Sequence, residues 1–204
     1  MIIAGASRHA KEIIQIIETD YKNLIFFDDY SQKINNFFTN WIVAKSTDEL
    51  KNRNETNFIL ALGGTKSRFI VAQKLMNAGF VMKSIVAKTA IIGNINMNLS
   101  EGLNIMHFSF VGNSVVIGKG TLINTYVSIH HDAVIGEFCD LSPRSTILGG
   151  ASVGNFTSIG SAAVILPDIK VGNNCVIGAG AIVINDIPDN SVAVGNPARV
   201  IKSQ

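Results

Sequence analysis

The sequence predicts a small Rossmann-like α/β domain followed by a parallel β-helix, and three observations predict it. Short apolar runs alternate with glycine turns and helical spacing in the first third of the chain. From residue 99 onward, an aliphatic residue recurs at every sixth position. Charge and glycine are also unevenly divided, since the first 88 residues hold 12 of the 17 Lys and Arg but only 4 of the 18 glycines. We therefore predict domains at 1–88 and 89–204, the second including a C-terminal tail.

The first domain reads as strands and helices in alternation. Residues 2–4, 24–27 and 58–62 are short apolar runs typical of buried parallel strands. Residues 10–19 and 66–77 have helical spacing, and Ser7 stands where a helix cap is expected. This order indicates a doubly wound sheet.

Polar or glycine-rich clusters follow three of the predicted strands. They are Gly5–His9, Asp28-Asp29 and Gly63-Gly64. Ligands of such sheets bind at the carboxyl ends of the strands, so the clusters favour a pocket for a nucleotide or nucleotide sugar. Ordinary structural turns are the alternative, because a complete Gly-x-Gly-x-x-Gly fingerprint is absent.

The second domain is built on a repeat of six residues, which fits neither a helix nor a simple strand. Fifteen consecutive positions carry Leu, Ile or Val: Leu99, Ile105, Val111, Ile117, Ile123, Ile129, Ile135, Leu141, Ile147, Val153, Ile159, Ile165, Val171, Ile177 and Val183. These side chains are expected to point inward and stack from coil to coil. The glycine that often follows them is expected to supply unusual backbone angles, and the small residue four positions on is expected to fill the crowded interior.

His130, His131 and Asp132 interrupt this apolar repeat. A neutral imidazole is the usual general base near neutral pH, and a carboxylate on its far nitrogen fixes the tautomer and raises basicity. The residues thus favour a catalytic histidine over the alternative, a solvated turn. A zinc site formed by these histidines and His107, as in β-helix enzymes of the gamma carbonic anhydrase type, is the less favoured interpretation, because their spacing does not match the histidine pattern of that family.

Composition excludes several classes. A formal charge of +2 does not suggest nucleic-acid binding, and no apolar run is long enough to cross a bilayer. Cys139 and Cys175 fall on the small-residue positions and are expected to be core residues. With no recognisable signal peptide, a cytoplasmic location is expected.

The whole chain resembles bacterial sugar O- and N-acetyltransferases of the sialic acid O-acetyltransferase and UDP-4-amino-sugar N-acetyltransferase type. The resemblance is carried by Gly-Ala-Ser-Arg-His-Ala at 5–10, Phe-Phe-Asp-Asp at 26–29, Ala-Leu-Gly at 61–63, Ile-Asn-Thr at 123–125, His-Asp at 131–132, Gly-Ala-Gly-Ala at 178–181 and Val-Gly-Asn-Pro-Ala-Arg at 194–199. It implies that the β-helix is left-handed.

The resemblance also implies an activity. Acetyl would pass from acetyl-CoA to the amino group of a nucleotide-linked 4-amino-4,6-dideoxy sugar in bacterial surface glycan synthesis. His131 would be the general base, Asp132 its support, and Asn124 would lie near the acceptor group. The alternatives are an O-acetyltransferase acting on sialic acid or a related sugar, and a non-catalytic trimeric protein that binds sugar nucleotides.

Binding residues follow from the same resemblance. The nucleotide sugar would contact Ser7, Arg8, His9, Asp28, Asp29 and Gly63, and acetyl-CoA would contact Asp140, Gly149, Ser161 and Ala179. No metal is expected. Homotrimers with active sites between subunits are expected. The chain departs from the family pattern at Arg8, Asp140 and Arg144, where relatives usually have glycine, histidine and glycine.

Overall fold

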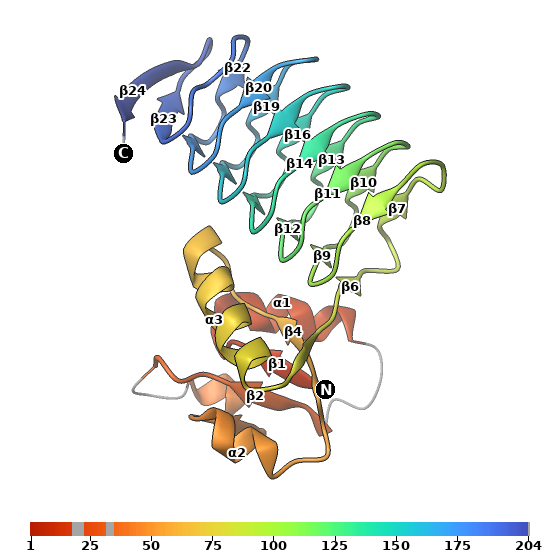
Figure 1. Cartoon of the computed structure of the whole chain (residues 1–204), viewed down its shortest axis with the longest axis vertical. Helices are drawn as coiled ribbons and strands as arrows, with labels where there is room; N and C mark the ends of the chain where they lie inside the picture. The colour runs from red at the N-terminus through yellow and green to blue at the C-terminus, as the bar shows by residue number, and fades with distance from the viewer. Residues whose placement is uncertain (18–22, 32–34, 204) are drawn as a thin grey trace.

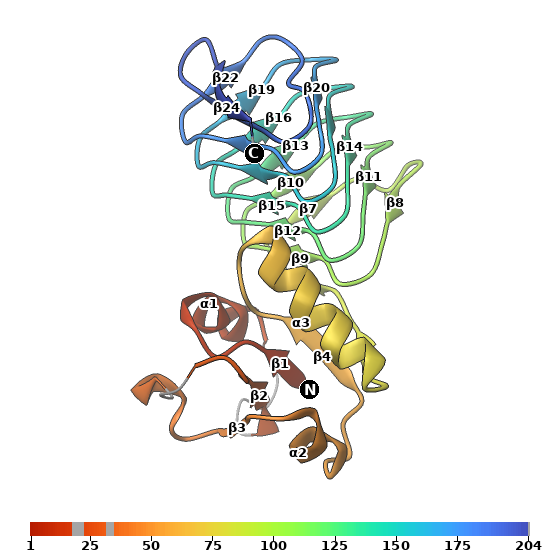
Figure 2. The same cartoon turned by 60° about the vertical axis from the view of Figure 1, so that its left-hand side comes forward.

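The computed structural model describes residues 1–17, 23–31 and 35–203. An α/β domain sits at one end of a stack of β-helix coils, and the C-terminus lies at the far end of that stack (Figure 1). Turning the molecule shows that helix α3 (Thr65–Asn77) reaches from the α/β sheet to the first coils (Figure 2). The predicted fold class, Rossmann-like domain and then β-helix, is confirmed.

The N-terminal sheet is parallel, with the strand order β3-β2-β1-β4-β5. Its strands are β1 (Ile2–Ala4), β2 (Ile25–Phe27), β3 (Ile42–Ala44), β4 (Asn57–Leu60) and β5 (Val81–Met82). The accompanying helices are α1 (Arg8–Ile16), α2 (Thr47–Lys51) and α3, with a 3₁₀ turn, η2 (Asn36–Phe38). The first strand is wholly buried at the centre of the sheet, which is why it reads as an unbroken apolar run.

The predicted strands and helices are all present, with shifted ends. Helix α1 begins two residues earlier than predicted and ends at Ile16, and residues 18 and 19 of the prediction lie outside the described residues. Ser7 does occupy the N-cap position, but its side chain makes no capping hydrogen bond. Strands β3 and β5 and helix α2 were not predicted, because each is too short for a periodic signal.

The β-helix strands are two residues long in all but the last turn. They are β6 (Ile85–Val86), β7 (Ile91–Ile92), β8 (Asn98–Leu99), β9 (Asn104–Ile105), β10 (Phe110–Val111), β11 (Val116–Ile117), β12 (Leu122–Ile123), β13 (Ser128–Ile129), β14 (Val134–Ile135), β15 (Asp140–Leu141), β16 (Thr146–Ile147), β17 (Ser152–Val153), β18 (Ser158–Ile159), β19 (Val164–Ile165), β20 (Lys170–Val171), β21 (Val176–Ile177), β22 (Ile182–Val183), β23 (Ser191–Val194) and β24 (Arg199–Ser203).

Every third strand joins the same sheet, so the coil has three faces. Face 1 is β24-β23-β21-β18-β15-β12-β9-β6, face 2 is β22-β19-β16-β13-β10-β7, and face 3 is β20-β17-β14-β11-β8. Parallel partners lie one coil apart, as in the pairing of Ile123 with Leu141. Fourteen of the fifteen repeat positions are buried and Leu99 packs at their edge, so the inward column is confirmed.

The small residues four positions after the column are also buried, as predicted, and they include Cys139 and Cys175. Burial raises the pKa of the Cys139 thiol to about 12 and raises that of Cys175 as well. Both thiols therefore stay protonated at neutral pH and act as core atoms.

The predicted reason for the repeat glycines is wrong. Positive φ occurs two residues after these glycines, at positions such as Phe138 and Phe156. The glycines themselves are needed because coils approach closely. A Cβ on Gly118 or Gly154 would lie 2.6 Å from a backbone nitrogen of the next coil. Close backbone contact, rather than turn geometry, selects glycine there.

The two domains meet on face 1. Strand β6, just before the predicted boundary at residue 88, already pairs with β9 of the β-helix. Ile85, Met106 and Leu122 are buried in one cluster with residues of the N-terminal sheet. In the described part of the chain, no helix combines the length and apolar character needed to span a membrane.

Candidate active site

The histidine pair lies in the turn from β13 to β14, at the corner between faces 2 and 3. His131 Nδ1 and Asp132 Oδ2 are 2.8 Å apart, and both side chains are exposed. Asp132 adopts a φ of 60°, a left-handed conformation that Asp tolerates better than most residues. A carboxylate on Nδ1 holds the proton there and leaves Nε2 as the free base.

Gly149 lies directly beside the imidazole, one coil further along. A Cβ at this position would be 2.5 Å from His131 Cε1 and 2.7 Å from Nε2, so any other residue would displace the ring from where it lies. The next amide, Gly150 N–H, donates to the carbonyl oxygen of His131 at 3.0 Å. The Gly149 amide enters no hydrogen bond within the described residues. An unpaired N–H beside a base can serve as an oxyanion donor.

His130 is turned to a different neighbour. Its ring centroid lies 5.7 Å from that of Phe110, on the preceding coil of face 2. It takes no part in the His131–Asp132 contact. In the described residues, no group of three His, Cys, Asp or Glu side chains is placed to hold a metal ion.

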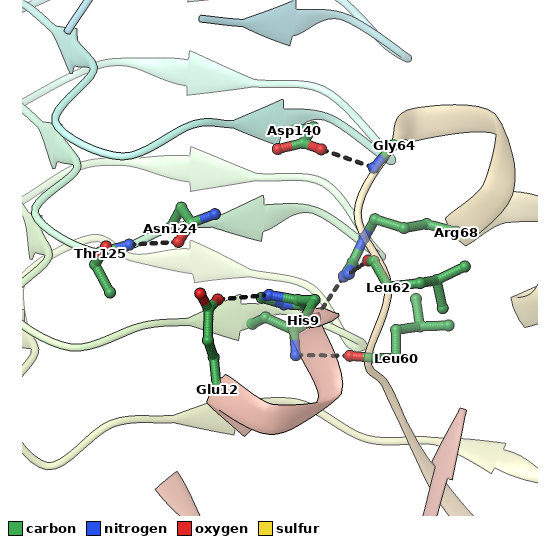
Figure 3. A network of polar contacts seen from close by, with 10 residues as sticks. His9, Glu12, Leu60, Leu62, Gly64, Arg68, Asn124, Thr125 and Asp140 are labelled. Carbon is green, nitrogen blue, oxygen red and sulfur yellow. Dashed lines mark hydrogen bonds and ion pairs between the residues drawn. The ribbon is translucent and has the colours of Figure 1, made fainter. Parts of the chain in front are cut away.

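Asn124 lies at another corner, in the turn from β12 to β13 between faces 1 and 2. Its Oδ1 accepts a hydrogen bond from Thr125 N–H at 2.8 Å, which fixes the amide and leaves its NH₂ group available (Figure 3). No hydrogen bond or ion pair of the described residues joins Asn124 to His131. One strand of face 2, β13, separates the two corners.

Polar residues gather where the N-terminal domain meets the coils, and we call this set, His9, Gly63, Gly64, Arg68, Asn104 and Asp140, the polar seam (Figure 3). Asp140 Oδ2 accepts from Gly64 N–H at 2.7 Å, across the domain boundary. His9 Nδ1 lies 3.0 Å from Glu12 Oε2, while His9 Nε2 is buried and has no partner within the described residues. Burial lowers the pKa of His9 below its usual value, so the ring is neutral at pH 7.

The N-terminal domain holds a pocket of about 400 Å³ at the carboxyl ends of its strands. Ser7, Asp28 and Asp29 line it, together with the apolar side chains of Phe27 and Leu62. Asp28 Oδ1 accepts from the amides of residues 30 and 31 at 3.2 and 2.9 Å, which shapes the pocket wall. Asp29 forms an ion pair with Lys74 of α3.

The residues suggested for nucleotide-sugar binding thus fall into two groups. Ser7, Asp28 and Asp29 line the pocket, while His9 lies at the seam. Gly63 also lies there, because a Cβ on it would come 3.4 Å from Asp140 Oδ2. Arg8 is exposed and is not among the residues that line the pocket.

The residues suggested for acetyl-CoA binding are also divided. Gly149 lies beside His131, whereas Ser161 and Ala179 lie in turns at the corner between faces 1 and 2, where Asn124 also lies. Asp140, on β15 of face 1, points to the N-terminal domain. Within one chain, therefore, these residues do not form a single cluster.

Sequence reasoning missed two polar residues at the seam, Arg68 and Asn104. Both are fully buried and hydrogen-bonded to each other. The available signal was an arginine within the helical pattern of residues 66–77, and an asparagine that directly precedes a column residue. Neither pattern could name its partner, because the partners lie on different domains.

Comparison with models of known protein families finds a match in each half of the chain. Residues 1–75 match the model of the PglD N-terminal domain, and residues 101–149 and 150–185 match that of the bacterial transferase hexapeptide (six repeats).

Solved structures resemble the entire chain. A variant of GDP-perosamine N-acetyl transferase from Caulobacter crescentus, in complex with CoA and GDP-perosamine, is 25% identical, with a TM-score of 0.88 over 99% of this chain and 96% of that one. The acetyltransferase domain of PglB from Neisseria gonorrhoeae, in complex with acetyl coenzyme A, is 24% identical, with a TM-score of 0.87 over 98% of both chains. WeeI from Acinetobacter baumannii is 23% identical, with a TM-score of 0.89 over 98% of both chains.

The similarities to PglB and to WeeI show only that the fold is shared. The two family models follow one another along one chain. The protein thus has a PglD-type N-terminal domain followed by bacterial transferase hexapeptide repeats, and over its whole length it is similar to a sugar N-acetyltransferase.

Proposed function

We propose that the protein transfers acetyl from acetyl-CoA to the amino group of a nucleotide-linked 4-amino-4,6-dideoxy sugar, in bacterial surface glycan synthesis. The observation that carries the proposal is the His131–Asp132 pair lying over Gly149, in a chain whose other domain holds a separate pocket. The similar transferase from Caulobacter crescentus, bound to CoA and GDP-perosamine, supports this substrate class.

The N-terminal pocket suits the diphosphate and nucleoside of the acceptor. Helices α1 and α3 both begin at its edge, and neither has an acidic residue in its first turn. Helix N-termini favour anions through their free N–H groups and their dipole. The hydroxyl of Ser7, which makes no capping hydrogen bond to α1, adds a donor at the same edge.

The sugar would extend from this pocket along the polar seam. The buried Nε2 of His9, which has no partner within the described residues, is suited to bind a polar group of the acceptor. The NH₂ group of Asn124 can donate a hydrogen bond to the acceptor sugar where the sugar reaches the β-helix. On this proposal, Ser7, His9, Asp28, Asp29, Gly63 and Asn124 serve the acceptor.

The reaction proceeds by direct attack. His131 Nε2 takes a proton from the acceptor amine as the amine nitrogen attacks the thioester carbonyl carbon, and the oxyanion is met by Gly149 N–H. When the tetrahedral intermediate collapses, the C–S bond breaks, the amide remains, and the proton passes to the CoA sulfur. Asp132 holds the imidazole tautomer throughout.

The separation of Asn124 from His131 favours a site shared by neighbouring subunits. Acetyl-CoA would lie in the groove between two copies, near Ser161 and Ala179 of one copy and Gly149 of the other. We propose a homotrimer with cyclic symmetry, which brings unlike corners of adjacent chains together. Residues 1–88 and 89–204 would then be an acceptor-binding and an acyl-transfer domain, working in the cytoplasm.

Turnover of a defined panel tests the proposal. Purified protein is given acetyl-CoA and UDP-, dTDP- or GDP-linked 4-amino-4,6-dideoxy sugars, and release of the CoA thiol is followed. We expect turnover with one nucleotide class and a loss of about 10²- to 10⁴-fold in kcat for His131→Ala. His130→Ala is the matched control at the same corner and should retain activity.

Other outcomes would contradict the proposal in distinguishable ways. Turnover only with sialic acid or a related sugar would assign O-acetylation instead. Binding of sugar nucleotides without any thiol release would indicate a non-catalytic protein. Full activity of His131→Ala would remove the proposed base.

A further inference from the structure

Arg68 on helix α3 is fully buried between the two domains. Its Nε donates to Gly120 O at 2.8 Å, and Nη1 donates to Leu62 O at 2.8 Å. Nη2 donates to Gly102 O at 3.5 Å and to Asn104 Oδ1. One guanidinium therefore joins a carbonyl of the N-terminal domain to three acceptors on the β-helix.

Asn104 continues this network back to the N-terminal sheet. Its Nδ2 donates to Leu60 O, the last residue of β4, at 2.9 Å. Together with the bond from Gly64 N–H to Asp140, three successive points along residues 60–64 are held to the coils (Figure 3). Leu60 and Leu62 are held through their carbonyls, and Gly64 is held through its amide.

The same segment forms a wall of the nucleotide pocket. Leu62 lines it, and so does Ser67 of α3, immediately before the arginine. On the other side, Asp140 is paired in register with Leu122 of β12, two residues before Asn124. The network thus connects a wall of the pocket to the coils next to the one that would receive the sugar.

Apolar packing reinforces the contact on the adjoining side of α3. The Phe69 ring meets Phe138 and Phe156 edge-on, at centroid distances of 5.2 and 5.4 Å. This aromatic contact can hold the domains together without a cation.

A buried cation is a costly way to join two domains. Burial lowers the pKa of Arg68 to about 10, with Asp140 opposing the shift, and the side chain is still charged at pH 7. Apolar residues of similar volume often stabilise such positions as well or better, whereas a fully bonded guanidinium fixes one geometry. Four acceptors on both domains define the relative position of the domains.

We propose that Arg68 is a positioning residue. By fixing the two domains relative to each other, it sets the distance from the nucleotide pocket to the place where the acceptor amine reacts. The role rests on the proposed acetyl transfer. Arg68 touches neither the pocket cavity nor His131, and acts through residues 60–64.

The test separates nucleotide binding from turnover. In Arg68→Met, the affinity for UDP, dTDP or GDP alone, measured by calorimetry, should change far less than kcat, because Leu62 is the only residue of the 60–64 segment among those that line the pocket. The kcat with the full nucleotide sugar should fall by about a hundredfold, the effect of misplacing a bound reactant by about 1 Å. Arg53→Met, the same change at an exposed arginine, is the control and should match wild type.

Hydrogen exchange of the amides in residues 60–64 provides a readout that does not need activity. These amides should exchange faster in Arg68→Met. If that protein fails to fold, Arg68→Lys carries the test, because it keeps the charge and can satisfy only part of the four acceptors. Its kcat should lie between those of wild type and the methionine variant.

Two results would overturn the role: an unchanged kcat, or equal loss of nucleotide affinity and kcat. A wild-type protein without turnover would refute the proposed function, and the exchange experiment would still decide whether Arg68 fixes the segment. Unchanged exchange in both variants would refute the positioning role independently.

Discussion

At the scale of single residues, His131 owes its chemistry to its position on the surface of a stack of coils. The repeat fills the interior with aliphatic and small side chains, and His131 and Asp132 lie outside this core, exposed at a corner. His131, Asp132 and Gly149 come from adjacent coils of one corner, and the close coil spacing brings them into contact. A regular fold thus supplies a fixed base without a dedicated loop.

His9 makes stability depend on pH. Its neighbours are Glu12, Arg68 and Asp140, and burial is the main cause of its lowered pKa. As the pH falls below 6.5, the unfolded chain gains a proton at His9 that the folded protein does not bind, so the free energy of unfolding falls. Above 6.5 this contribution is fully retained.

Replacing His9 by Gln should therefore flatten the pH dependence of stability. We expect urea midpoints of the variant to change less than those of wild type between about pH 8 and pH 5.5. Carboxyl groups ordinarily titrate near pH 4, below this window, so the difference between the two profiles reports His9. Parallel profiles would contradict the assignment.

At the scale of elements, the two-residue strand is stable only because it is repeated. Each strand inside a face is paired to one coil above and one below, as Ile147 of β16 is through β13 and β19. The aliphatic column supplies the burial, while glycine lets neighbouring backbones approach to within contact distance. Both requirements fall on the same six-residue period, which is why the sequence displays it so clearly.

Truncating one column residue should measure this dependence. Ile147→Ala removes a fully buried side chain between two coils and should lower the free energy of unfolding by about 2–5 kcal/mol. Val134→Ala, an exposed position on face 3, is the control and should cost far less. Urea denaturation followed by circular dichroism gives both values, and similar losses would contradict the stacked-column account.

At the scale of the whole molecule, the features that depend on residues close together in the sequence were predictable. Those that depend on contacts between distant segments were not. The β-helix was predictable because its pattern is local and repeated fifteen times. The pocket was partly predictable, since Ser7, Asp28 and Asp29 follow strands whose ends must meet at one edge. The contact between Arg68 and Asn104 was not, because it joins segments of different domains and leaves no periodic trace.

The separation of Asn124 from His131 also follows from how the coils are arranged in space. Asn124 and His131 are seven residues apart in the sequence, yet a strand of face 2 places them at different corners. The resemblance assigns both residues to one reaction, whereas coil geometry separates the two side chains within a single chain. If both serve one reaction, the second corner belongs to another copy of the chain.

Mixing two inactive variants tests that arrangement. Asn124→Ala and His131→Ala are each expected to lose activity as pure proteins. In trimers reassembled at random from equal amounts, about one quarter of the shared sites would combine an intact Asn124 with an intact His131. Activity should therefore recover to about a quarter of wild type in the mixture. The double variant mixed with wild type is the control for reassembly. No recovery in mixtures whose subunits have exchanged would show that one chain supplies both residues.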